Sequence, residues 1–270
     1  MSGMTKVSHL AQIHPSAEIA EDVEIGPFSV IGPKVKIGRG CRLYNNVTIV
    51  GDTRIGEYNR IFSGAVIGTE PQDLKYVGEL SFVEIGNRNT IREFVTINSG
   101  TVANNGSTVI GNDNLMMSYC HIAHDCVLGN GIIISSGAMM AGHVVVEDFA
   151  VIGGGAGIHH YATIGLHSFV SAMSGTRTDV PPFMLAEGIP AKVRGINIVG
   201  LKRHGYSHDQ IAAIKEAYRA IYRSNINFRD AVKNLEDLCT VFEEVKMLVD
   251  FLDQMEKGRK GRYRELTRRY

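Results

Sequence analysis

The sequence contains no tryptophan, only four cysteines among 270 residues and no excess of charge of either sign. Because 28 basic and 28 acidic side chains cancel, the composition argues against a general nucleic-acid binder. The cysteines form neither a CxxC pair nor a dense framework, so we expect reduced thiols and no disulfide scaffold. They are Cys41, Cys120, Cys126 and Cys239.

Long apolar runs are absent as well. None approaches the roughly 18 residues of a membrane span, and the first residues lack the charged-then-apolar pattern of a signal peptide. We therefore expect a cytoplasmic protein without stable membrane insertion. What the chain has in quantity is glycine, at 30 residues, which suits a turn-rich fold with thin side-chain layers.

An aliphatic side chain recurs at every sixth position over most of the chain. The pattern runs without a gap over residues 13–67, resumes over 85–97 and continues over 110–170. Six residues are about 1.67 turns of an α-helix, so this period cannot keep the aliphatic positions on one helical stripe. Glycine often follows the aliphatic residue, and the fifth place is mostly small. This is the hexapeptide pattern of a parallel β-helix.

The repeats also predict the dimensions and the core of this fold. There are 24 of them, which gives about eight triangular coils of three hexapeptides each, stacked at the β spacing of roughly 4.8 Å. The aliphatic column then lies inside the prism and buries a continuous apolar core. Three cysteines, Cys41, Cys120 and Cys126, occupy the small fifth place, where we expect small buried hydrophobes rather than reactive groups.

Two interruptions of the repeat are expected to leave the prism as loops without disturbing the stacking. The first, residues 68–84, carries Gln72, Asp73 and Lys75, which either reach a ligand or belong to a solvated turn. The second follows residue 97.

Beyond about Asp179 the repeats stop and the apolar spacing becomes helical. Ser207 and Gln210 have the spacing of a capping box ahead of a helix, and two further amphipathic segments follow. The predicted fold is therefore mainly β, with a parallel β-helix over residues 1–189 and a small C-terminal α-helical domain over residues 190–270.

Six of the ten histidines lie between positions 121 and 167. Counting hexapeptides in threes places Ile122, Met140 and Ile158 on the same side of successive coils. Histidines near them then stack along one edge, in a column on the order of 10 Å long. This column contains His124, His143, His159 and His160, with His121 just around the corner from His124.

The histidine spacing leaves several functions open. Three imidazoles can bind zinc with a water in the fourth place, as in hexapeptide-repeat carbonic anhydrases. One neutral imidazole, with a reference pKa of about 6.5, can instead act as a general base. Asp125 can orient such a base only if the chain turns at 124 and 125, because neighbouring residues of a strand point to opposite faces. If the protein is instead a non-catalytic scaffold, the stacked histidines have no function.

Several stretches resemble one family closely. They are PQDLKY (71–76), VEIGNRNTIRE (83–93), HIAHDC (121–126), AGHV (141–144), DVPPF (179–183) and NIVGLKRH (197–204). Together they run along nearly the whole chain, and it resembles the acyl-carrier-protein-dependent UDP-N-acetylglucosamine O-acyltransferases that open lipid A biosynthesis. The resemblance implies a homotrimer and a left-handed β-helix, whereas the general rule for parallel crossovers would give a right-handed one.

The same resemblance implies a direct transfer of a 3-hydroxyacyl group from acyl carrier protein to the 3-position of the UDP-sugar. His124 would be the general base, Asp125 would hold its imidazole, and the N–H of Gly142 would receive the developing oxyanion. No metal, no other cofactor and no acyl-enzyme is required, because a thioester is already activated.

Further positions follow from the resemblance alone. The residues expected to bind substrate are Gln72, Asp73, Lys75, His121, His143, His159, His160, Asn197 and Arg203, and those expected to limit acyl length are Ala172 and Met173. This chain has His160, Val199 and His204 where relatives commonly carry Gln, Glu and Arg. The alternative of an N-acylating hexapeptide enzyme predicts a separate N-terminal uridine-binding domain, for which repeats that begin at Ile13 leave no room.

Overall fold

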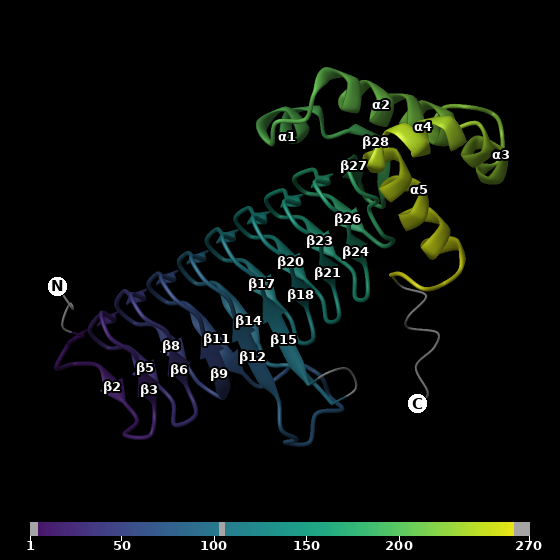
Figure 1. Cartoon of the computed structure of the whole chain (residues 1–270). Coiled ribbons are helices and arrows are strands. Elements are labelled where there is room, and N and C mark those ends of the chain that lie inside the picture. Colours follow the sequence, from purple (N-terminus) through teal and green to yellow (C-terminus); the bar gives the residue numbers. More distant parts are fainter. Residues whose placement is uncertain (1–4, 103–105, 262–270) are drawn as a thin grey trace.

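The computed structural model, which describes residues 5–102 and 106–261, is a prism of parallel strands with helices at one end (Figure 1). Each coil contributes one short strand to each of three sheets, so that neighbouring strands within a sheet are three apart in chain order. The fold is the predicted left-handed parallel β-helix followed by helices.

The three sheets are defined here by their strands. The first sheet contains β1 (Lys6–Val7), β4 (Glu24–Ile25), β7 (Arg42–Leu43), β10 (Arg60–Ile61), β13 (Thr90–Ile91), β16 (Leu115–Met116), β19 (Ile133–Ile134), β22 (Val151–Ile152), β25 (Phe169–Val170), β27 (Met184–Gly188) and β28 (Ala191–Ile196). The second sheet contains β2 (Gln12–Ile13), β5 (Val30–Ile31), β8 (Thr48–Ile49), β11 (Val66–Thr69), β14 (Thr96–Asn98), β17 (His121–Ile122), β20 (Met139–Met140), β23 (Gly157–Ile158) and β26 (Gly175–Thr176). The third sheet contains β3 (Glu18–Ile19), β6 (Lys36–Ile37), β9 (Asp52–Ile55), β12 (Phe82–Ile85), β15 (Ser107–Ile110), β18 (Val127–Leu128), β21 (Val145–Val146) and β24 (Thr163–Ile164).

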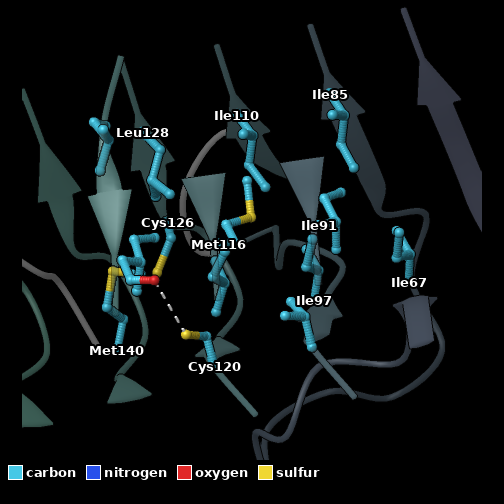
Figure 2. Close-up of a cluster of buried hydrophobic side chains, with 14 of the residues drawn as sticks. Ile67, Ile85, Ile91, Ile97, Ile110, Met116, Cys120, Cys126, Leu128 and Met140 are labelled. Carbon is cyan, nitrogen blue, oxygen red and sulfur yellow. Dashed lines mark hydrogen bonds between the residues drawn. The ribbon is translucent and has the colours of Figure 1, made fainter. Parts of the chain in front are cut away.

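The hexapeptide period places the core. Most strands contain two residues in this structure, and the second of them is the aliphatic residue, which points into the prism because side chains alternate along a strand. Ile61, Ile91 and Met116 are in register on successive coils and are fully buried, and Figure 2 shows the last two of them inside the prism. The predicted apolar column is therefore confirmed, and further coil strands, β1 and β26, lie beyond the repeats counted from the sequence.

Both interruptions leave the prism at the edge between the second and third sheets. Residues 70–81 connect β11 to β12, and a second insertion, in which residues 103–105 are not described, connects β14 to β15 (Figure 1). The stack is not disturbed, because β12 pairs in parallel register with β9 and with β15 across the insertions. The prediction of extruded loops is confirmed.

The end of the prism passes into the helices through an antiparallel pair, β27 and β28. The helices are α1 (Ile198–Arg203), α2 (His208–Tyr222), α3 (Phe228–Lys233), α4 (Glu236–Val241) and α5 (Glu243–Glu256). The predicted capping box is present, since Ser207 and Gln210 exchange hydrogen bonds at the start of α2. Of the described helices, none is long and apolar enough to cross a bilayer.

The helices pack on the end of the β-helix rather than standing apart from it. Phe183 and Met184, from the last turn of the prism, lie in one buried cluster with Leu201, Ile214 and Leu248 of the helices. The strand pair β27–β28 also crosses the predicted division at residues 189 and 190. The division into 1–189 and 190–270 stays a prediction, and its last nine residues, 262–270, lie outside the described part of the chain.

Candidate active site

The histidines meet at the edge where the second sheet turns into the third. His121 of β17 pairs with Met139 of β20, and Met139 pairs with Gly157 of β23, so the turns that follow these strands stack directly. The predicted register is therefore confirmed. The ring centroids of His124 and His143 are 5.1 Å apart at a right angle.

The turn at residues 124 and 125 that the sequence required is present. Asp125 has a φ of 61°, in the left-handed region that aspartate tolerates better than most residues. This conformation brings two neighbouring side chains to the same side, and His124 Nδ1 lies 2.8 Å from Asp125 Oδ2. The chain has thus formed a histidine oriented by a carboxylate from adjacent positions.

Two threonines from other segments hold Asp125, which is 1% exposed: Thr101 binds its carboxylate and Thr108 its backbone N–H. The N–H of Thr101 donates to Oδ1 at 2.9 Å and its hydroxyl donates to Oδ2 at 2.7 Å, while the N–H of Asp125 donates to Thr108 Oγ1. Burial by itself would raise the pKa of Asp125, but the hydrogen bonds from His124 and Thr101 keep it below the usual value. The carboxylate is therefore an anion at neutral pH.

Gly142 supplies a surface against which the His124 ring lies. A Cβ at this position would be 2.5 Å from His124 Cε1, so only glycine leaves room for the ring. Among the described residues the N–H of Gly142 has no hydrogen-bond acceptor. A buried N–H beside the candidate base is a donor available to a developing oxyanion.

His143 and His121 complete the surroundings of His124. The His143 ring stacks on Tyr161 with centroids 4.3 Å apart, and its Nε2 lies 3.7 Å from Asp125 Oδ2. His121 Nδ1 lies 2.8 Å from Thr96 Oγ1. Burial, together with the neighbouring His124, lowers the pKa of His121, which keeps its ring neutral.

His121, His124 and Gly142 line a cleft of about 520 Å³ on the outer face of the second sheet, and His143 lies behind them, outside its lining. Its walls carry both apolar and polar groups, as small-molecule sites usually do. The lining residues are Gln72, His121, Ala123, His124, Met139, Met140, Ala141, Gly142, Gly157, Ile158, His159, Gly175, Thr176, Arg177 and Ile189. The insertion loop therefore brings Gln72 to the candidate base within one chain.

Other predicted site residues lie outside this cleft. In the same loop Asp73 accepts a hydrogen bond from the N–H of Lys75, and neither residue lines the cleft. The His160 ring lies beside the His159 ring, with centroids 3.9 Å apart, but it does not line the cleft.

Asn197 begins α1, where its side chain accepts from the N–H of Gly200 and donates to the carbonyl of His167. Its amide is thus engaged within the fold. Arg203 is at the exposed end of the same helix. Ala172 and Met173 are exposed at the edge between the first and second sheets, on the far side of the second sheet from His124.

The buried cysteines are not available as nucleophiles. Cys126 Sγ lies 3.3 Å from the carbonyl oxygen of Ala141, and burial raises the pKa of this thiol to about 12. Burial raises the pKa of Cys120 to about 11. Since the thiolate is the reactive form, the prediction of small buried hydrophobes is confirmed for both.

Within the described residues, the group able to offer three ligand atoms to a metal is His124, Asp125 and His143, whose candidate atoms lie within 4.8 Å of one another. However, Asp125 Oδ2 already accepts hydrogen bonds from the Thr101 hydroxyl and faces His124 Nδ1. This geometry is that of a base oriented by an acid, and it differs from the three-imidazole zinc site left open by the sequence.

Sequence reasoning missed Thr101, Thr108, Tyr161 and Arg177. Thr108 occupies the small fifth place of a hexapeptide and Thr101 lies in an insertion, so neither carried a signal of its own. Arg177 follows β26, one coil beyond His159, and could have been found by extending the coil count one step further.

Three family models match parts of this chain. Residues 179–260 match the model of UDP-N-acetylglucosamine O-acyltransferase, domain 2, while residues 7–107 match the GMPPB C-terminal domain and residues 107–142 the bacterial transferase hexapeptide, six repeats. Acyl-[acyl-carrier-protein]–UDP-N-acetylglucosamine O-acyltransferases from Thermodesulfovibrio yellowstonii and Burkholderia lata are 46% and 45% identical over 94% of this chain and 99% of their own length.

A solved structure of LpxA from Acinetobacter baumannii is 42% identical, superposes with a TM-score of 0.88, and covers 92% of this chain and 96% of its own. Both the sequence and the fold are thus matched over almost their entire length. The chain belongs to the family of acyl-[acyl-carrier-protein]–UDP-N-acetylglucosamine O-acyltransferases.

Proposed function

We propose that this chain transfers a 3-hydroxyacyl group from acyl carrier protein to the 3-position of UDP-N-acetylglucosamine, the first step of lipid A biosynthesis, with His124 as general base. The observation that carries this proposal is the 2.8 Å contact between His124 Nδ1 and Asp125 Oδ2 at the wall of the cleft. Because the carboxylate accepts from Nδ1–H, Nε2 is the nitrogen left without a proton and able to take one.

The reaction then proceeds without a covalent intermediate on the protein. The sugar 3-hydroxyl gives its proton to His124 Nε2 while its oxygen attacks the thioester carbonyl carbon. The carbonyl oxygen becomes an oxyanion that accepts from the N–H of Gly142. As the carbonyl re-forms, the C–S bond breaks, and the carrier thiolate leaves and takes the proton from the imidazolium. Asp125 stabilises that imidazolium during the step.

Side chains around the base position the sugar in this proposal. His121, His143, His159 and Gln72 lie at or beside the cleft and offer polar groups to the sugar and its acetamido group. His160 contributes through the ring of His159. We assign Ala172 and Met173 to the end of the acyl chain, which would cross the outer face of the second sheet to reach them.

We further propose that the enzyme is a homotrimer in which Asp73, Lys75, Asn197 and Arg203 reach the cleft of a neighbouring copy. Leu74 and Val77 of the insertion loop support this, since they are 105% and 90% exposed in the single chain. Large apolar side chains presented together to solvent are typical of an interface. Sedimentation equilibrium of the purified protein tests the assembly, and a monomer at assay concentration would overturn it.

The enzyme is proposed to act in the cytoplasm, where acyl carrier protein and UDP-sugars are made. Its partners would then be the acylated carrier protein, the UDP-sugar and its own copies, and neither nucleic acid nor a membrane.

The direct test incubates the purified protein with UDP-N-acetylglucosamine and a panel of 3-hydroxyacyl carrier proteins, and follows the acylated sugar by mass spectrometry. We expect one chain length to be preferred and a monoacylated product. No acylated sugar with any donor would contradict the proposal.

A chelator separates this mechanism from a zinc enzyme. We expect turnover to stay within twofold of its starting value after prolonged dialysis against EDTA, because the proposed base is an imidazole and not a metal-bound water. Loss of activity that zinc restores would favour the carbonic-anhydrase-like alternative.

A further inference from the structure

The cleft contains a cationic side chain, Arg177, that takes no part in the proposed acyl transfer. Arg177 follows β26, which pairs in register with β23, so that Gly175 stands next to Gly157 and Arg177 stands one coil above His159. The residues that follow β23, β20 and β17 in the same register are His159, Ala141 and Ala123, each one coil below the last. Three steps at the β spacing place Arg177 roughly 14 Å along the prism from the coil of His124.

Arg177 is the one lysine or arginine among the described residues that line the cleft. Its side chain is exposed, and within the described residues it makes neither a hydrogen bond nor an ion pair. A guanidinium is always charged and offers five N–H donors in a fork that matches phosphate oxygens. An unengaged guanidinium at the wall of a cleft is therefore a candidate phosphate-binding group.

The floor of the cleft between His124 and Arg177 contains glycines that the fold does not require. Gly157 and Gly175 are the outward residues of their strands and have ordinary strand conformations. A Cβ at Gly157 would meet nothing within 4 Å, and one at Gly175 would only touch Ile189 at 3.5 Å. A glycine in a strand without a packing reason often marks a site that a ligand approaches closely.

We infer that Arg177 binds the phosphodiester of the donor's phosphopantetheine arm, which lies over Gly157 and Gly175 while its thioester reaches His124. This inference rests on the proposed function and adds a donor-binding residue to it.

Distance decides between the two phosphate groups that the substrates carry. About 13 bonds separate sulfur from phosphorus in the donor arm, or about 15 Å at the roughly 1.2 Å per bond of an extended chain. Only about five bonds separate the sugar 3-oxygen from the nearer phosphorus, or about 6 Å on the same scale. The span from His124 to Arg177, roughly 14 Å, matches the donor arm, and the nucleotide diphosphate would fall between one and two coils short.

The test compares two small donors that differ only in the phosphate, a 3-hydroxyacyl-phosphopantetheine and the corresponding 3-hydroxyacyl-pantetheine thioester. The acyl chain is the one that the wild-type protein transfers best. We expect the wild type to prefer the phosphorylated donor by about tenfold in kcat/KM, the size of one partly exposed charge-assisted contact. Arg177→Ala should abolish this preference, and Arg177→Glu should reverse it.

Arg219→Ala is the matched control, because Arg219 is an exposed arginine on α2, outside the cleft. It should keep the wild-type preference. The KM for UDP-N-acetylglucosamine should be the same in the Arg177 variants as in the wild type, whereas a rise in that KM with the donor preference intact would assign Arg177 to the nucleotide and overturn the inference. A wild type without any preference overturns it too, while absence of all transfer by the wild type contradicts the proposed function itself.

The glycine floor gives a second readout. Gly157→Ala adds a methyl to the path of the arm and should lower kcat/KM for both donors several-fold. Gly195→Ala is its control, because a Cβ at Gly195 also meets nothing within 4 Å but the residue lies on β28, outside the cleft. Equal donor kinetics in the two alanine variants would show that nothing lies over Gly157 and would remove the path from the inference.

Discussion

Two groups of histidines lie at different edges of the same prism, and they differ in what their rings contact. At the cleft, the His124 ring bonds to a buried carboxylate and His143 lies beside it. At the edge between the third and first sheets, His167 stacks on Phe149, with centroids 4.8 Å apart, and also contacts His204 and Tyr206 of the helical end.

An aspartate is near each group, but only one of them orients a ring. The Asp125 carboxylate meets His124 Nδ1, whereas Asp148 accepts from the N–H of His167 through its backbone carbonyl and uses its carboxylate for Asn130. Burial lowers the pKa of His167 to about 4, with a further contribution from His204 that Asp148 opposes. The same residue type is thus a candidate base at one edge and part of the contact between the prism and the helices at the other, and the hydrogen-bond partner makes the difference.

The largest effect should come from removing the cleft histidine. His124→Ala is expected to lower kcat for acyl transfer by roughly 10² to 10⁴, the usual contribution of a general base, with the circular dichroism spectrum and Tm close to those of the wild type. His208→Ala is the control, since its side chain is 97% exposed on α2. Near wild-type turnover of the His124 variant would show that another group takes the proton.

Lowering the pH should destabilise the folded protein through protonation of His167. The pKa of His167 is about 4 in the folded state against about 6.5 when unfolded, so the unfolded state binds more protons between these values and stability falls as the pH falls. The free energy of unfolding should decrease by about 3 kcal/mol from pH 6.5 to pH 4 on this account.

Urea denaturation over this range measures the slope. His167→Phe, which keeps the stack on Phe149, should flatten it, while His208→Ala should not. A His167→Phe protein with an unchanged slope would place the acid sensitivity elsewhere.

Removing the charge of Asp125 should also lower catalysis strongly. Asp125→Asn is expected to lower kcat by roughly 10² to 10⁴, because an amide can donate to Nδ1 and so leave the proton on Nε2. Asp113→Asn is a matched control, since Asp113 also has a positive φ, of 59°, in a turn but lies at the edge between the third and first sheets. Equal kcat values for the two variants would show that Asp125 does not orient the His124 imidazole.

The smallest effect is expected from Ala172, at the edge between the first and second sheets. Ala172→Gly should favour donors longer by one or two carbons, by about fourfold for the methyl group's worth of space, near 0.8 kcal/mol. A competition assay with a ladder of 3-hydroxyacyl carrier proteins measures the shift. An unchanged chain-length profile would remove Ala172 from the acyl pocket and confine the acyl chain to the cleft side of the second sheet.

Individual residues show which features of the site could be predicted from the sequence. The stacking of His124 and His143 followed from counting by sixes, because each parallel coil must repeat the register of the one before it. Even the turn at Asp125 could be stated as a requirement, since neighbouring strand residues otherwise diverge. Thr101 could not be predicted, because it lies in an insertion where the repeat no longer fixes the position of any side chain.

In the helical end, a local feature could be predicted from the sequence and a long-range contact could not. Its capping box was readable from Ser207 and Gln210, since capping depends on four neighbouring residues. Asn197 was expected at a nucleotide, but its amide holds the start of α1 and the carbonyl of His167, and within one chain it does not line the cleft. Such a contact depends on residues 30 positions apart, which no local pattern reports.

The sequence by itself determined the prism, its buried aliphatic column and the edge on which the imidazoles gather, because hydrogen bonding between identical coils leaves one register that buries every sixth side chain. Tertiary structure alone decided that Thr101 binds the Asp125 carboxylate, that Gln72 lines the cleft and that Asn197 binds the carbonyl of His167. These contacts arise from insertions and from the packing of the helical end, where the partners of a side chain come from distant segments and the period of six no longer constrains them.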